Sequence, residues 1–120
     1  MKIMIVDDNK SIRSLVRRVI GFVTREKIEL RECSDGNEAV TSYSESPSDL
    51  VVMDIAMPQK DGIAAAEEIT ANDISAKIIF LTQHSVSDYG FLKEKPGVLA
   101  VISKENVAEL KAELELHLPK

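Results

Sequence analysis

The Asp54 carboxylate stands where the chain leaves a predicted buried strand. Leu50–Met53 is an apolar run of four residues, which suits a strand covered on both faces, as in a parallel sheet. Open α/β sheets bind their ligands at this end of the strands. An Asp in such a place can instead cap the next helix, but Pro58 restricts Met57 to extended geometry, and Asp61 is the better cap. We therefore predict a functional role for Asp54.

Polar side chains also follow three other apolar runs. Asp7 and Asp8 come after the first predicted strand, Thr82 after the fourth and Lys104 shortly after the fifth. The carboxyl ends of parallel strands lie on one edge of a sheet, so these residues can meet Asp54 in one shallow cleft. Taken singly, either acid could cap the first helix, Thr82 could simply end a strand, and Lys104 could be a solvated surface lysine. Their position at four strand ends favours a common site.

The predicted cluster combines three carboxylates with an ammonium and a hydroxyl group. Carboxylates brought together repel one another unless a cation joins them. Oxygen ligands suit Mg²⁺, which binds one or two carboxylates and keeps several waters. Together these groups make a site for an anion with several oxygens, above all a phosphoryl group. The carboxylate oxygen of Asp54 could act as the nucleophile and form an aspartyl-phosphate.

The elements that must hold this cluster alternate between strand and helix. The clearest helical period has apolar residues at positions 12, 15, 16, 19, 20 and 23. Asp35 with Glu38, and Asn106 with Glu109, resemble capping boxes at the start of two further helices. Residues 85–92 form the weakest helical segment, because they contain Gly90 and are closed by a Pro-Gly pair.

The predicted strands are Ile3–Val6, Ile28–Cys33, Leu50–Met53, Lys77–Leu81 and Val98–Ile102. Five strands alternating with five helices and joined by short loops imply a parallel sheet with right-handed crossovers. The sequence therefore predicts one three-layer α/β domain over residues 1–120.

The composition is that of an acidic globular protein. Its 120 residues include 15 Lys and Arg and 20 Asp and Glu, which gives a net charge of −5. Without a basic cluster such a chain is a poor direct binder of nucleic acid. The apolar runs are too short for membrane insertion, and the start lacks a signal-peptide pattern. Cys33 is the single cysteine, so no disulfide can form within the chain, and we expect a cytoplasmic protein.

Five segments carry a resemblance to a known family. They read IMIVDDNKSIR, SDGNEAV, DLVVMDIAMPQKDGI, IIFLT and VISK, and they are spread over essentially the whole chain. Among them, DIAMPQKDG is a highly specific motif. The sequence resembles a response-regulator receiver domain of two-component signal transduction, of the single-domain chemotaxis type. The resemblance implies a flavodoxin-like fold with strand order 2-1-3-4-5.

The resemblance also implies roles for the acidic residues. Asp54 would be the phosphoacceptor and would receive its phosphoryl group from a sensor histidine kinase or a histidine phosphotransfer protein. Asp8, Asp54 and the backbone carbonyl of Ala56 would bind Mg²⁺ directly, and Asp7 would bind it through water.

A receiver would be a signalling phosphoacceptor rather than an enzyme, promoting its own phosphorylation and dephosphorylation. Thr82 would bind a phosphoryl oxygen, and Lys104 would pair with the phosphoryl group. The surface of the fourth helix, fifth strand and fifth helix would then change and signal to a partner. We expect a monomer or a weak phosphorylation-dependent dimer. Since no output domain follows Lys120, the chain would be a stand-alone receiver or part of a longer regulator.

Three residues depart from the usual pattern of the family. Val101 stands where an aromatic residue is usual. Glu105 follows Lys104 where many members have proline, and a non-proline cis peptide at that point is unfavourable by ~2.5–4 kcal/mol. Gln83 follows Thr82 where a small residue usually leaves the path to the phosphate open. The first two changes affect the expected signalling surface, and the third affects the lifetime of the phosphoryl group.

Other functions fit the sequence less well. A phosphatase of the haloacid-dehalogenase type needs a second acid two residues after its nucleophile, where this chain has Asn9, and a cap domain does not fit in its length. A nucleotide-binding module would need a Gly-rich loop after the first strand. The third alternative is a receiver-like interaction module that is never phosphorylated. The complete polar cluster argues against it, and Val101 argues for it.

Overall fold

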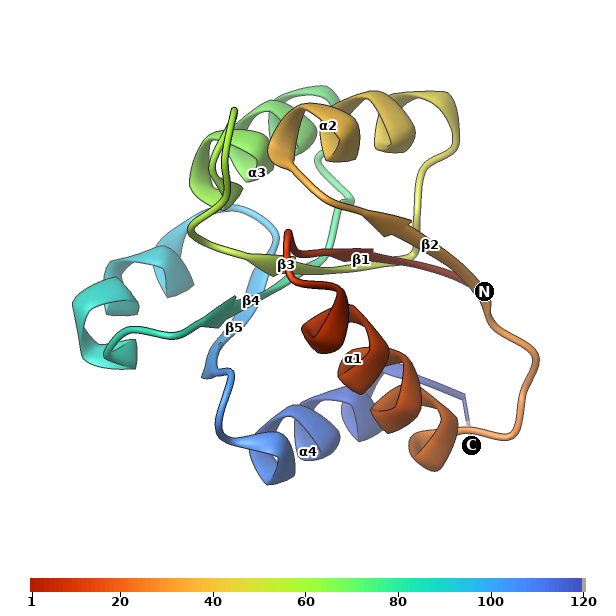
Figure 1. Ribbon diagram of the computed structural model, residues 1–120. Helices are drawn as coiled ribbons and strands as arrows, with labels where there is room; N and C mark the ends of the chain where they lie inside the picture. Colours follow the sequence, from red (N-terminus) through yellow and green to blue (C-terminus); the bar gives the residue numbers. More distant parts are fainter. Residues whose placement is uncertain (120) are drawn as a thin grey trace.

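The computed structural model describes residues 1–119, which form one parallel β-sheet between two layers of helices (Figure 1). The strands lie in the order β2-β1-β3-β4-β5. They are β1 (Lys2–Val6), β2 (Glu29–Cys33), β3 (Leu50–Asp54), β4 (Ile78–Thr82) and β5 (Val98–Ser103). The helices are α1 (Lys10–Val23), α2 (Gly36–Glu45), α3 (Gly62–Asn72), α4 (Val107–His117) and a 3₁₀ helix, η1 (Val86–Glu94). The predicted flavodoxin-like α/β fold and its strand order are confirmed.

The core has two halves, because successive side chains of a strand point to opposite faces of the sheet. On one face, Met53 and Phe80 pack with Ala65 of α3 and Leu92 of η1. On the other face, β-strand residues such as Val52 pack against α1 and α4. Figure 1 shows α2 and α3 on one side of the sheet and α1 and α4 on the other. All residues of β3 and β4 are buried, which explains their unbroken apolar sequences.

Side-chain caps fix where the four α-helices begin. Asn9 caps α1, with its Oδ1 accepting from the backbone N–H groups of Ser11 and Ile12 at 2.8 and 3.4 Å. The interpretation of Asp7 or Asp8 as the cap of this helix is therefore wrong. Their carboxylates are left for the edge of the sheet.

The predicted caps of the other helices are present. Asp35, Asp61 and Asn106 accept from the backbone N–H groups of the residues three positions later, at 2.8, 2.8 and 3.0 Å. The capping boxes close differently from the usual pattern, because Glu38 accepts from the backbone of Ser34 and Glu109 accepts from the side chain of Asn106. These contacts still hold each helix start to the loop before it.

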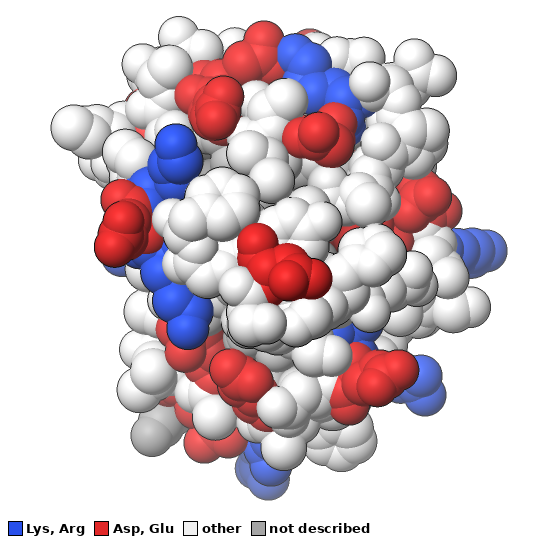
Figure 2. Space-filling model, turned by 90° about the vertical axis from the view of Figure 1, so that its left-hand side faces the viewer, with Lys and Arg blue, Asp and Glu red and all other residues white. Residues whose placement is uncertain are grey.

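The segment predicted to be the weakest helix is the 3₁₀ helix η1. It extends to Glu94, further than the sequence pattern suggested, and Leu92 is its one fully buried residue. The face of the molecule that carries η1 mixes acidic and basic side chains with uncharged surface between them (Figure 2). That face offers no uninterrupted basic stripe of the kind that binds nucleic acid.

None of the helices within residues 1–119 has the length and apolar character needed to cross a bilayer.

Candidate functional site

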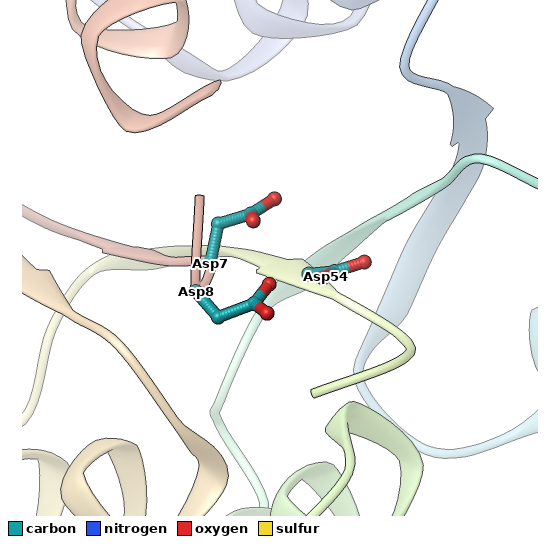
Figure 3. A group of neighbouring side chains, drawn as sticks. All are labelled: Asp7, Asp8 and Asp54. Atoms are coloured by element: carbon teal, nitrogen blue, oxygen red, sulfur yellow. The ribbon is translucent and has the colours of Figure 1, made fainter. Parts of the chain in front are cut away.

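Two adjacent strands bring the three acidic residues together. β1 pairs in parallel with β3, with Val6 opposite Met53, so the residues that follow these two lie side by side. Figure 3 shows the carboxylates of Asp7, Asp8 and Asp54 pointing the same way from the ends of the two strands. Each offers one oxygen, and these oxygens lie within 4.8 Å of one another. The predicted acidic cluster is therefore present at the carboxyl edge of the sheet.

Lys104 joins two of these carboxylates. Its Nζ lies 2.9 Å from Asp7 Oδ2 and 3.1 Å from Asp54 Oδ1, and its side chain is only 6% exposed. The backbone N–H of Lys104 also donates to the carbonyl of Thr82 at 2.9 Å. This bond holds the start of the loop between β5 and α4 to the end of β4. The interpretation of Lys104 as a solvated surface lysine is therefore wrong.

The charge on Lys104 is maintained by its partners. Burial alone would lower the pKa of this lysine, but the hydrogen bond and ion pair with Asp7, and the ion pair with Asp54, outweigh burial and raise it. The ammonium group therefore stays charged at neutral pH and compensates part of the negative charge of the cluster.

Asp54 is a buried carboxylate whose pKa is raised above its usual value. Loss of hydration on burial, followed by the charge of Asp7, raises its pKa to about 6, although Lys104 acts in the opposite direction. The side chain is only 5% exposed. At neutral pH the carboxylate is therefore mostly ionised but poorly hydrated, which is a suitable state for a nucleophile.

Asp7 and Asp8 differ in their surroundings. Asp7 is buried, its Oδ1 accepts from the N–H of Asn9 at 2.8 Å, and its own N–H donates to the carbonyl of Cys33 at 3.1 Å. Its Oδ2 is buried and has Lys104 Nζ as its partner at 2.9 Å. Asp8 is exposed. The clustered carboxylates form an all-oxygen donor set, which fits a hard divalent cation such as Mg²⁺.

A cavity of about 180 Å³ opens above Asp54. This volume equals the share of about six waters in the liquid, so it has room for a small tetrahedral anion. Thr82 is buried at its edge, with Oγ1 accepting from the N–H of His84 at 2.9 Å, while its hydroxyl proton can still be donated. The cavity is lined by Asp8, Asn9, Asp54, Ala56, Thr82, Gln83, His84 and Lys104.

Two glycines bring neighbouring backbone close to the site. A Cβ at Gly62 would overlap the carbonyl oxygen of Asp54, and a Cβ at Gly36 would overlap that of Lys60. The N–H of Gly62 donates to the carbonyl of Ile55 at 2.7 Å. The loop between β3 and α3 is therefore folded back tightly against the end of β3 at Asp54.

All the residues predicted for the site line this cavity except Asp7. Asp7 is connected to the cavity through its ion pair with Lys104. Sequence reasoning missed Asn9, which lines the cavity, and Arg13, whose Nη1 donates to the carbonyl of Asp7 at 2.6 Å. The cap preference of Asn at this position could have revealed Asn9. Arg13 ends the segment IMIVDDNKSIR, but no pattern in the linear sequence indicates its contact with the Asp7 carbonyl.

Comparison with known proteins decides the family. The family described as "response regulator receiver domain" matches residues 3–115. The chain belongs to this family. Receiver domains are signalling modules of two-component systems and not enzymes in the ordinary sense, so the phosphatase and nucleotide-binding alternatives are excluded.

Similar receiver-containing proteins occur in archaea and bacteria. The chain is 42% identical over 82 residues to the chemotaxis protein CheY of Halobacterium salinarum, an alignment that covers 68% of this chain and 65% of that protein. It is 34% identical over 110 residues to the uncharacterized transcriptional regulatory protein YhcZ of Bacillus subtilis, covering 91% of this chain and 50% of that protein. The chain thus spans about two thirds or less of the length of these relatives.

Solved receiver structures have the same fold. A two-component response regulator of the LuxR family from Aurantimonas sp. is 32% identical, with a TM-score of 0.83 over 96% of this chain and 82% of that one. The response regulator TrrA of Thermotoga maritima, solved in complex with Mg²⁺-BeF, is 30% identical, with a TM-score of 0.81 over 98% of both chains. The receiver fold of the present chain is therefore shared along its whole length.

Proposed function

We propose that this receiver accepts a phosphoryl group on Asp54 from a phosphohistidine of a sensor histidine kinase or a histidine phosphotransfer protein. The observation that carries the proposal is the state of Asp54. Its carboxylate is buried, paired with Lys104 on one side, and open on the other to a cavity that Asp8 and Thr82 also line. Such a group is both accessible to a phosphoryl donor and able to attack it.

The proposed transfer is a single displacement at phosphorus. A carboxylate oxygen of Asp54 forms a new P–O bond as the P–N bond to the donor imidazole breaks, and the imidazole leaves with that electron pair. The ammonium of Lys104 turns its ion pair toward a phosphoryl oxygen, and the hydroxyl of Thr82 donates to another. Both groups lie beside the acceptor before the reaction, so little reorganisation is needed.

Mg²⁺ would be held by the carboxylates of Asp8 and Asp54 and by the backbone carbonyl of Ala56, with Asp7 contributing through water. When bound, it would neutralise part of the negative charge that builds up on the transferred group. Loss of the phosphoryl group by hydrolysis, assisted by the same residues, would reset the protein. The TrrA structure with Mg²⁺-BeF supports this assignment by similarity.

The output of the phosphorylated receiver would be a contact with another protein. The relatives include chemotaxis proteins and transcriptional regulators, so we propose that a downstream target protein or an attached output domain recognises the altered surface. We propose a cytoplasmic protein that is monomeric or forms a weak dimer on phosphorylation and makes no direct contact with nucleic acid.

Acetyl phosphate with Mg²⁺ tests the proposed acceptor. Intact-mass spectrometry should show one added phosphate on the wild-type protein and none on Asp54→Asn. Asp49→Asn is the matched control, since Asp49 is an exposed residue just before the opposite end of the same strand, and it should be labelled like the wild type. Equal labelling of Asp54→Asn would refute the assignment. No labelling of the wild type would favour a receiver-like module that works without phosphorylation.

A further inference from the structure

Arg13 connects the acidic pair to the edge of the sheet. Besides its bond from Nη1 to the Asp7 carbonyl, its Nε donates to Oε1 of Glu32 at 2.9 Å. The side chain is only 16% exposed. One planar guanidinium group thus binds an acceptor at the end of β1 and an acceptor in β2 at the same time, a geometry that a lysine cannot reproduce.

The other carboxylate oxygen of Glu32, Oε2, accepts hydrogen bonds from a second arginine. Arg17, one turn further along α1, donates to Oε2 of Glu32 from Nη2 at 2.8 Å and from Nε at 3.2 Å. Hydrogen bonds from Arg17 and then from Arg13 lower the pKa of Glu32, so it stays ionised at neutral pH. Each carboxylate oxygen therefore has its own arginine, and Arg13 is fixed at both ends.

The carbonyl that Arg13 binds belongs to the peptide unit between Asp7 and Asp8. A peptide unit is planar, so fixing its oxygen fixes the direction in which the next residue leaves it. The N–H of Asp7 is fixed independently by the carbonyl of Cys33. Rotation of this peptide would turn the exposed side chain of Asp8 away from Asp54, and Arg13 opposes that rotation.

We propose that Arg13, held by Glu32, is a positioning residue that orients Asp7 and Asp8 for binding of a divalent cation. The proposal rests on the proposed function, because it assumes that these acids hold Mg²⁺. Arg13 itself touches neither the metal position nor Asp54. Its effect would be to keep Asp8 turned toward the cavity before the ion arrives.

Charge and geometry predict opposite effects when Arg13 is replaced, which makes the proposal testable. Arg13 carries a positive charge near a cation site, so its charge alone disfavours Mg²⁺. If charge were all that mattered, Arg13→Met would bind Mg²⁺ more tightly than the wild type. If Arg13 positions the acids, the same variant binds Mg²⁺ more weakly despite the lost repulsion.

The experiment is a Mg²⁺ titration followed by NMR through the amide resonances of Asp8 and Ala56, without any phosphodonor. Arg13→Met should weaken binding about tenfold, at the lower end of what loss of a partner behind a metal ligand causes. Arg13→Lys keeps the charge but not the two-acceptor geometry and should also weaken binding. The control is Arg18→Met, which removes the same charge from an exposed position of α1 and should not weaken it.

Urea unfolding without metal separates folding from positioning, because affinity is measured only on variants that are folded. If Arg13→Met fails to fold, the result for Arg13→Lys decides. Binding by the folded Arg13 variants that equals or exceeds that of the wild type would overturn the proposal. A wild-type protein that does not bind Mg²⁺, or an Asp8→Ala variant that binds it unchanged, would instead contradict the metal site in the proposed function.

Discussion

Two segments line opposite sides of the same cavity and are built in different ways. On one side the loop from β1 leads into α1. This helix is capped by the side chain of Asn9 and buries Val16, Val19 and Ile20. On the other side the loop from β4 leads into η1, which has no side-chain cap bond and buries only Leu92 fully. One wall of the site is thus anchored and the other is weakly held.

This difference suggests separate tasks for the two walls. The anchored wall carries Asp8 and would keep the proposed ligands for a cation in place. The weakly held wall begins at Thr82, whose hydroxyl accepts from the N–H of His84, so a pull on Thr82 is passed to His84, two residues before η1 begins. Val101 is buried and stiff about χ1, and it has no ring to swing. We therefore expect the response to phosphorylation in residues 83–97.

The largest expected effect is in amide hydrogen exchange. In the free protein, amides of η1 should exchange on the order of 100-fold faster than those in the middle of α1, because local opening of a poorly anchored segment requires less free energy. Addition of beryllofluoride and Mg²⁺ should slow exchange over residues 83–97 and change little at Val101. Protection changes clustered on β5 and α4, with residues 83–97 unchanged, would contradict the prediction that residues 83–97 respond to phosphorylation.

The buried carboxylate of Asp54, at the end of β3 between the two walls, should make stability depend on pH. The folded protein holds the proton of Asp54 more tightly than the unfolded chain, because its pKa rises from 3.8 to about 6. Without metal, this residue therefore lowers the free energy of unfolding as pH rises between these values. At pH 7, Asp54→Asn should raise that free energy by about 2 kcal/mol, somewhat less than the shift alone would give, since Lys104 loses one partner.

Urea unfolding of metal-free protein measures this effect. The gain should shrink as pH falls from 7 to 4, where the wild-type carboxyl is already protonated in the folded state. Asp49→Asn should show no comparable pH-dependent gain. An Asp54→Asn protein less stable than the wild type at pH 7 would mean that its pairing with Lys104 outweighs the loss of hydration.

A pair of glycines compares the two walls directly. A methyl group at Gly21 in α1 or at Gly90 in η1 would meet no atom within 4 Å apart from its chain neighbours and the backbone of its own helix. Each substitution by Ala should therefore stabilise the protein, by up to about 1 kcal/mol for Gly21 in the α-helix and by about 0.5 kcal/mol for Gly90. Only Gly90→Ala should reduce the exchange change produced by beryllofluoride. Equal reduction by both variants would show that the response is not confined to η1.

The smallest expected effect concerns the lifetime of the phosphoryl group. Hydrolysis needs a water in line with phosphorus, and the side chains of Gln83 and His84 line the cavity on the weakly held side. We expect the Gln83 side chain to shield the phosphoryl group from this water. Gln83→Ala should therefore shorten the half-life a few-fold, as measured by intact mass after removal of the phosphodonor. Gln83→Leu keeps the bulk of the side chain and should lose its phosphate at the wild-type rate. An unchanged half-life for Gln83→Ala would exclude shielding by this side chain.

The sequence by itself determined the order of strands and helices and the edge of the sheet at which polar residues meet. Short unbroken apolar runs such as Leu50–Met53, bounded by polar residues, are typical of strands covered on both sides, and parallel strands put their carboxyl ends together. The observed boundaries differ by a few residues, as in β4, which begins at Ile78 and includes Thr82. The cluster of Asp7, Asp8 and Asp54 followed from this topology alone, whereas the chemical roles of its members stay predictions.

The tertiary structure decided which contacts these residues make. Lys104 bridges Asp7 and Asp54 because the registers of the sheet bring the ends of β1, β3 and β5 close together at one edge, and no spacing along the chain shows these contacts. The contact of Arg13 with the Asp7 carbonyl likewise depends on how α1 packs over the sheet. Local patterns arise from neighbours along the chain, but a charge network across elements depends on distances that exist only once the core has formed.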